Sequence, residues 1–225
     1  MRNIIIITKE PIKMEIAMRE HILRNCFFES DTTILRNNML QMNASADKDE
    51  VIFRKLTSDE IKLAESVFRD VIKYNRVKIY RGSGKTVAQS KIMTQPRNGG
   101  VIVAINEYRE DFSTGYDNFH ESAKSTHLFI LAMAFVWQYY RYDSSFCDPY
   151  TSTNVYQYSF NKPSFNFYTL EQQASIIADY WLLNKYSIQT YEELTGCRDY
   201  ERNNLNFKSS LLKEYKKILK HIFSI

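Results

Sequence analysis

Cysteine is scarce, and the three cysteines present, Cys26, Cys147 and Cys197, lie far apart in the sequence. No CxxC pair occurs, so the sequence offers no thiolate zinc site. An odd number of widely spaced cysteines is typical of free thiols in a reducing compartment. Cys147 also lacks any local signature of a catalytic nucleophile.

Long apolar runs and flexible tracts are missing as well. The longest apolar run, 128–137, is far shorter than the about 20 residues that cross a bilayer. The short apolar run 4–7 is followed at once by charged residues, unlike a secretory signal. Glycine and proline number only 6 and 4, which argues against long linkers. We therefore expect a cytoplasmic protein with no membrane insertion.

Strong charge of one sign is absent too. The chain has 30 basic and 26 acidic side chains, a formal net charge of +4, and the basic residues look scattered along the sequence. This balance does not predict nucleic-acid binding. Hydrophobic residues make up 44% of the chain and charged residues 25%, which is typical of a folded globular protein with a sizeable core.

Local patterns predict an α+β fold that is mainly helical. Thr57 with Glu60, and Thr169 with the first turn after it, are typical of capped helix starts. Helices are also expected over 122–142 and 203–223, and strands over 76–80 and 101–105. Less regular segments suggest a strand over 3–8 and a helix over 12–25. A polar connector over 43–50 suggests an N-terminal appendage, residues 1–55, before a main domain, residues 56–225.

Four blocks of the main domain resemble the small zinc-metallopeptidase-like proteins associated with Rhs and VgrG elements of bacterial type VI secretion. The third and fourth blocks are the more specific. The resemblance implies a zincin-like fold with a small sheet and an active-site helix. The blocks comprise residues 56–60, 67–68 and 77–82 together as the first, then 108–112, 129–139 and 170–180.

The third block differs from the family at its chemical groups. The family reads F-I-H-E-M-[TA]-H-V-W-Q, in which HExxH supplies two zinc-binding histidines one helical turn apart and a glutamate that handles the proton of the zinc-bound water. In this chain the segment is Leu131-Ala132-Met133-Ala134-Phe135. Leu131 and Phe135 replace the histidines and Ala132 replaces the glutamate. We therefore expect hydrocarbon in place of zinc, no catalytic residue and no cofactor.

The fourth block resembles the helix that provides a third ligand in gluzincin-type peptidases. Glu171 and Asp179 are present, whereas the inner acidic position is occupied by Ser175. The sequence alone does not decide which of the two glutamate positions held the metal. Together with Tyr108 and Asp111, Glu171 and Asp179 are candidates for a remnant cleft.

A displaced metal site is the main alternative. His120, Glu121 and His127 are the nearest donors, but the two histidines are seven residues apart, about 10 Å along one helix. A helix cap and polar surface are the simpler explanation for these residues. The glycine-rich segment 82–86 ends like a P-loop but has Ile79 where the motif needs its first glycine. A turn after a strand is therefore the simpler interpretation there.

Aromatic residues are abundant between 112 and 186, and core packing explains most of them. Several tyrosines over 150–168 lie in polar sequence, where an interface is the alternative. We expect a non-catalytic pseudo-metallopeptidase that binds another protein, either as an immunity or adaptor protein for a cognate effector, or as an effector-associated Rhs or VgrG component. A non-catalytic exported effector without a signal peptide, a structural subunit of an Rhs cage, and a metal-dependent hydrolase with a relocated site are the alternatives.

Overall fold

The structure is a computed structural model, and it describes residues 53–82, 92–95, 100–104, 108–114, 118–142, 156–196 and 207–223. These residues belong to one compact unit, Val51–Ile225. The predicted strand over 3–8, the helix over 12–25 and the connector over 43–50 lie outside the described residues. So do the three cysteines and most of the P-loop-like segment.

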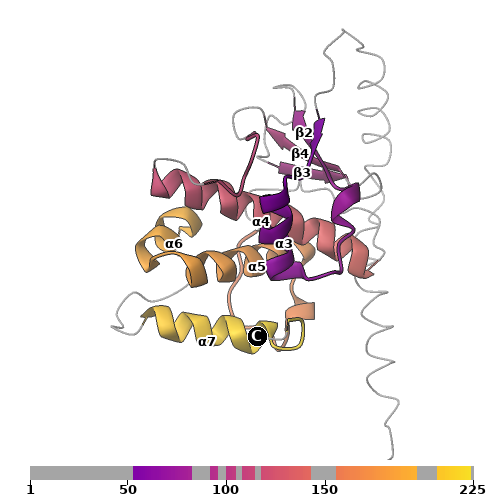
Figure 1. Ribbon diagram of the computed structural model, residues 1–225. Helices are drawn as coiled ribbons and strands as arrows, with labels where there is room; N and C mark the ends of the chain where they lie inside the picture. The colour runs from indigo at the N-terminus through magenta and orange to yellow at the C-terminus, as the bar shows by residue number, and fades with distance from the viewer. Residues whose placement is uncertain are drawn as a thin grey trace, which may run out of the picture. The chain divides into compact units, whose positions relative to one another are not determined.

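A four-stranded mixed sheet forms one side of this unit (Figure 1). Its strands, in the order β1-β2-β4-β3, are β1 (Phe53–Lys55), β2 (Lys78–Gly82), β4 (Gly100–Ala104) and β3 (Ile92–Gln95). The central pair, β2 and β4, is parallel, and each edge strand is antiparallel to its neighbour. The predicted strands 76–80 and 101–105 correspond to β2 and β4. The edge strands were not predicted, because strands of three or four residues carry almost no periodicity.

Helix α3 (Ser58–Phe68) begins at the predicted capping box, in which Thr57 Oγ1 accepts from the Glu60 amide and the Glu60 side chain accepts from the Thr57 amide. An apolar stripe that continues through Val71 and Ile72 predicts a helix up to about Tyr74, but α3 ends earlier, at Phe68. Arg69 adopts a positive φ of 56°, and the Tyr74 hydroxyl donates to the Arg69 carbonyl. The fully buried Glu60 carboxylate also pairs with Arg54 of β1 through two bonds of 2.7 Å, which tie the sheet edge to this helix.

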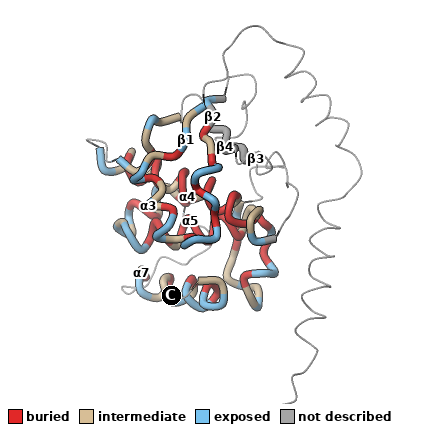
Figure 2. Tube along the Cα trace, turned by 45° about the vertical axis from the view of Figure 1, so that its right-hand side comes forward, coloured by how far each residue is buried: buried red, intermediate tan, exposed pale blue. Residues whose placement is uncertain are grey.

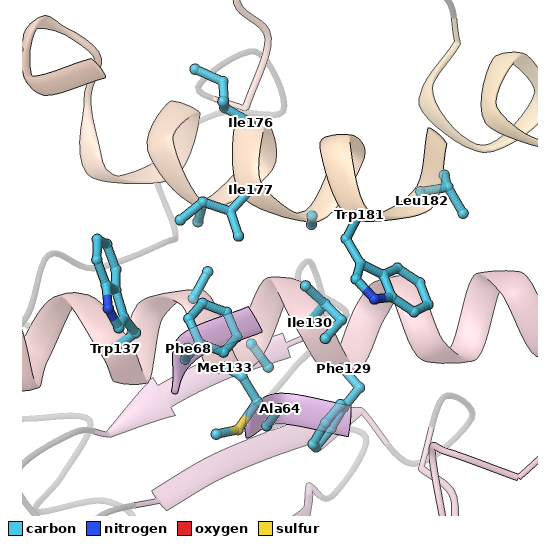
Figure 3. Packing of buried hydrophobic residues seen from close by; sticks show 14 of the residues in the cluster. Ala64, Phe68, Phe129, Ile130, Met133, Trp137, Ile176, Ile177, Trp181 and Leu182 are labelled. Carbon is cyan, nitrogen blue, oxygen red and sulfur yellow. The ribbon is translucent and has the colours of Figure 1, made fainter. Parts of the chain in front are cut away.

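Helices α4 (Phe119–Tyr142) and α5 (Leu170–Lys185) form the centre of the core. Figure 3 shows Ile130 of α4 and Ile177 of α5 between the two helices, while Ile176 points to the other side of α5. Both isoleucines of α5 are buried. Helix α4 packs against one side of α5 and α7 packs against another, so residues on both sides of α5 are buried (Figure 2).

Two further helices complete the unit. Helix α6 (Ile188–Thr195) is capped by Ser187 and ends at Gly196 in the left-handed conformation. Helix α7 (Phe207–Leu219) packs on α5, so that the sheet, α4, α5 and α7 succeed one another in Figure 1. Short 3-10 turns occur at Tyr74–Arg76 and Phe165–Phe167.

The prediction of a mainly helical α+β protein is confirmed. The zincin-like character of the fold stays a prediction. The division of the chain into 1–55 and 56–225 also stays a prediction, although residues 53–55 form a strand of the main sheet.

Candidate functional site

Polar contacts fix how α4 and α5 face each other. His127 Nε2 lies 2.8 Å from Asp179 Oδ1, and Gln138 Nε2 donates to the Leu170 carbonyl at 2.8 Å. A residue early in α4 thus meets one late in α5, and a residue late in α4 meets the start of α5. The two helices are therefore antiparallel, and a step forward along α4 corresponds to a step backward along α5.

This register brings Leu131 of the third block and Ser175 of the fourth block to the same level of the helix pair. Leu131 lies one turn after His127, and Ser175 lies one turn before Asp179, so both are displaced in the same direction from the His127–Asp179 contact. The helix that carries Leu131, Ala132 and Phe135 is thus packed against the helix that carries Ser175.

The side chains at these positions are short or apolar. Ala132 and Ser175 are each 2% exposed. Leu131 and Phe135 are partly buried against the hydrophobic core, and the Phe135 ring contacts that of Tyr156 with centroids 6.4 Å apart. A methyl group, a hydroxyl and two hydrocarbon side chains provide neither a general base nor a strong ligand for Zn²⁺.

A buried polar network lies one helical turn from these positions. Asp179 is fully buried, and its Oδ2 accepts from the Tyr158 hydroxyl at 2.8 Å. The Tyr158 hydroxyl also contacts that of Tyr215 on α7, which lies 2.8 Å from the hydroxyl of Tyr191 on α6. The network therefore joins α4, α5, α6 and α7 through hydrogen bonds rather than through hydrocarbon contacts alone.

The hydroxyl protons of the network can be assigned from valence. An ionised Asp179 only accepts, so Tyr158 donates its single proton to the carboxylate. Tyr215 must then donate to Tyr158, and Tyr191 must donate to Tyr215. His127 can donate to the same carboxylate only when its Nε2 carries a proton. In the neutral tautomer Nδ1 is then an acceptor, and it has no hydrogen-bond partner among the described residues.

Burial controls the acidity of these tyrosines. Burial raises the pKa of Tyr158 well above its ordinary value, and the nearby Asp179 charge raises it further. Burial likewise raises the pKa of Tyr215. The two hydroxyls therefore stay protonated through neutral pH and act as hydrogen-bond groups, not as bases.

The candidate ligands of a displaced metal site contact different residues. His120 Nε2 lies 3.3 Å from Glu193 of α6, with Glu121 only at the edge of the ion-pair distance, whereas His127 pairs with Asp179. Within the described ranges, no group of three or more histidine, cysteine, aspartate or glutamate side chains is arranged to hold a metal ion.

The residues predicted to form a remnant cleft separate into different places. Asp179 belongs to the buried network, and Glu171 lies in the first turn of α5. Tyr108 lies beside the sheet, with the guanidinium groups of Arg54 and Arg81 each 5.8 Å from its ring centre. The structure therefore does not gather these residues around one cleft.

Asp111 has a local role in the loop before α4. Its Oδ1 accepts from both the amide and the hydroxyl of Ser113. Although partial burial opposes the change, these hydrogen bonds lower the pKa of Asp111 below its ordinary value. The carboxylate is therefore ionised and held by hydrogen bonds at neutral pH.

An open cleft of about 600 Å³ lies between α3, the 113–114 loop and the helices α4 and α5. The rings of Phe119, Tyr186 and Trp181 follow one another along it, with centroid separations of 5.0 and 5.8 Å. Its walls carry one carboxylate and one ammonium group, so their charge does not select a class of ligand. The lining residues are Asp59, Leu63, Ser113, Thr114, Phe119, Thr126, Trp181, Lys185 and Tyr186.

The sequence interpretation missed the three network tyrosines. Two tyrosines of the stretch 150–168, Tyr158 and Tyr168, are 5% and 3% exposed, so core packing and not an exposed interface explains these two. Each network tyrosine comes from a different element, and no local spacing links them. A tyrosine on an otherwise apolar helix face, as at Tyr215, was the one available signal.

No family model matches the sequence, and no curated protein matches it. Among solved structures, the effector domain of VgrG2b from Pseudomonas aeruginosa is similar to this chain, with 20% sequence identity and a TM-score of 0.46. The alignment covers 81% of this chain and 97% of that domain. A likeness at this level assigns neither a family nor an activity to the chain. Among the described helices, none has the length and hydropathy to span a bilayer.

Proposed function

We propose that the chain is a non-catalytic pseudo-metallopeptidase that acts by binding another protein. In this proposal it is an immunity or adaptor protein, or an effector-associated component, in a bacterial type VI secretion or Rhs setting. The setting rests on the four sequence blocks described above.

The observation that supports the loss of catalysis is the shared level of Leu131 and Ser175 on facing helices. Two helices that formerly held a metal between them would have their ligands at one level. Here that level carries apolar or short side chains, and Ala132 offers no proton acceptor. Partly buried hydrocarbon stabilises this packing, whereas unpaired ligand groups in the same place would cost free energy.

Metal content tests this half of the proposal. The full chain, purified without a histidine tag or chelator, is expected to contain zinc far below one ion per chain by elemental mass spectrometry. A combined variant, Leu131→His, Ala132→Glu, Phe135→His and Ser175→Glu, is expected to bind about one zinc ion, because it restores three ligands at one level of the helix pair. The matched control omits Phe135→His and is expected to bind zinc far more weakly.

Two results would count against this account. A folded combined variant that takes up no zinc would mean that the four positions are not a former metal site. Stoichiometric zinc in the unmodified chain would instead favour the alternative, a metal-dependent hydrolase with a relocated site. His127 beside Asp179 is the observation that favours that alternative, so His127→Ala should then remove the metal.

Direct binding measurements test the other half. The purified chain is expected to form a complex with a product of a neighbouring gene, detected by calorimetry or size-exclusion chromatography. Binding to an effector domain supports the immunity or adaptor role, and binding to a structural Rhs or VgrG component supports the effector-associated role. If the chain binds none of these products, the proposed role in such a system is wrong.

A further inference from the structure

The excess positive charge of the chain is concentrated on its last helix. Five of the 30 basic residues and one of the 26 acidic residues lie between Lys208 and Lys220. The rest of the chain therefore has 25 of each, and its formal charge is zero. The interpretation of the basic residues as scattered is wrong for this segment.

Four of these lysines form a stripe on α7 and the residue that follows it. Lys213, Lys216, Lys217 and Lys220 are spaced as i, i+3, i+4 and i+7, which places them on one face over about 10 Å. All four are exposed, and none makes an ion pair with another described residue. Lys208 differs, because its Nζ donates to the Tyr186 carbonyl at 2.7 Å.

The opposite face of α7 is fully used in the core. Leu211, Tyr215, Ile218 and Leu219 are buried, and Tyr215 is held by hydrogen bonds to Tyr158 and Tyr191. The helix is thus fixed with its lysines outward, and Figure 1 shows α7 at the margin of the unit, beyond α5. Like charges this close together oppose one another until a partner neutralises them.

We propose that this lysine stripe is a docking surface for an acidic helical segment of a partner protein. A helix with carboxylates at the same i, i+3, i+4 and i+7 spacing matches the stripe in length and charge. This inference rests on the protein-binding half of the proposed function and is independent of the lost metal site.

Two other occupants fit less well. A membrane-bound amphipathic helix inserts its apolar face, but that face of α7 is buried within the protein. Binding sites for single-stranded nucleic acid add stacking aromatic side chains to their lysines and arginines, whereas the stripe consists of lysine alone.

Binding of a designed peptide tests the surface on the full chain. The probe is a labelled helical peptide with glutamates at i, i+3, i+4 and i+7, and its partner probe has glutamines there. At low ionic strength the glutamate peptide should bind at least tenfold more tightly than the glutamine peptide, as measured by fluorescence anisotropy. Added salt should weaken the binding.

A pair of protein variants separates location from net charge. Replacing Lys213, Lys216, Lys217 and Lys220 with glutamine should weaken binding roughly tenfold to a hundredfold. The control replaces four other exposed lysines with glutamine and reaches the same net charge, so its affinity should stay within about threefold. The control positions are Lys55, Lys62, Lys73 and Lys185.

Equal losses in the two variants would overturn the proposal, since net charge alone would explain the binding. Stronger competition from duplex DNA or from phosphatidylserine vesicles than from unlabelled glutamate peptide would also overturn it, in favour of nucleic acid or membrane. The metal content of the same preparations reports separately on the pseudo-metallopeptidase proposal. Zinc in the protein would therefore leave the peptide result standing.

Discussion

Replacing Tyr158 with phenylalanine should destabilise the protein more than the loss of a single ordinary hydrogen bond would. The Tyr158 hydroxyl is buried between Asp179, to which it donates, and Tyr215, from which it accepts. Its removal leaves the Asp179 Oδ2 atom without this donor and the Tyr215 proton without its acceptor. Phenylalanine keeps the ring, so the change removes the hydroxyl group alone.

The expected size follows from these two groups. A buried polar group that loses its partner costs about 1 to 3 kcal/mol, and a charged acceptor lies at the upper end. We therefore expect Tyr158→Phe to lower the free energy of unfolding by about 3 kcal/mol. Tyr191→Phe is the matched control, because Tyr191 donates to Tyr215 in this network and its removal leaves the Tyr215 proton bonded to Tyr158. Its expected cost is about 1 kcal/mol.

Urea denaturation of the wild type and both variants, followed by circular dichroism, measures the difference. The slopes of the transitions should agree, so that the midpoints report stability alone. Equal costs for the two variants, or a larger cost for Tyr191→Phe, would refute the assigned direction of proton donation.

Three further outcomes are expected. Gly196→Ala should cost about 1 kcal/mol, because the position has φ 66° but nothing within 4 Å of an added methyl group, and urea denaturation would show a loss near zero if backbone strain were irrelevant. Arg54→Met should cost about 3 to 5 kcal/mol by stranding the buried Glu60 carboxylate, whereas Lys62→Met, at an exposed pair, should leave the free energy of unfolding nearly unchanged; similar costs would contradict the buried-pair argument. Because the pKa of Tyr215 is higher in the folded protein than in the unfolded chain, where it is about 10, the buried neutral hydroxyl contributes to stability fully at pH values below about 10. This contribution should be lost as the pH rises toward the pKa of the folded protein. Alkaline denaturation should therefore be shallower in Tyr215→Phe, and an unchanged pH dependence would exclude this contribution.

Helix starts and the central helix pair were predictable because their signals are local. Thr57 with Glu60, and Thr169 with Gln172, both form capping boxes. The end of α3 was not predictable, since the apolar stripe continues past Phe68 and the turn at Arg69 depends on a hydrogen bond from Tyr74. The edge strands were missed because pairing with neighbouring strands, rather than their own residues, makes them strands.

The identity of the side chains at 131, 132, 135 and 175 is fixed by the sequence alone, and so is the absence of imidazole and carboxylate groups there. Helical periodicity also places Leu131 and Phe135 on one face without further information. Tertiary structure decided which groups meet across that face. His127 and Asp179 are 52 residues apart, and Tyr158 and Tyr215 are 57 apart, so their contacts exist only once α4, α5, α7 and the segment before α5 pack together. The spacing of the lysine stripe is likewise determined by the sequence. Its exposure is decided by the tertiary structure, because the opposite face of α7 is buried and the lysines therefore face outward.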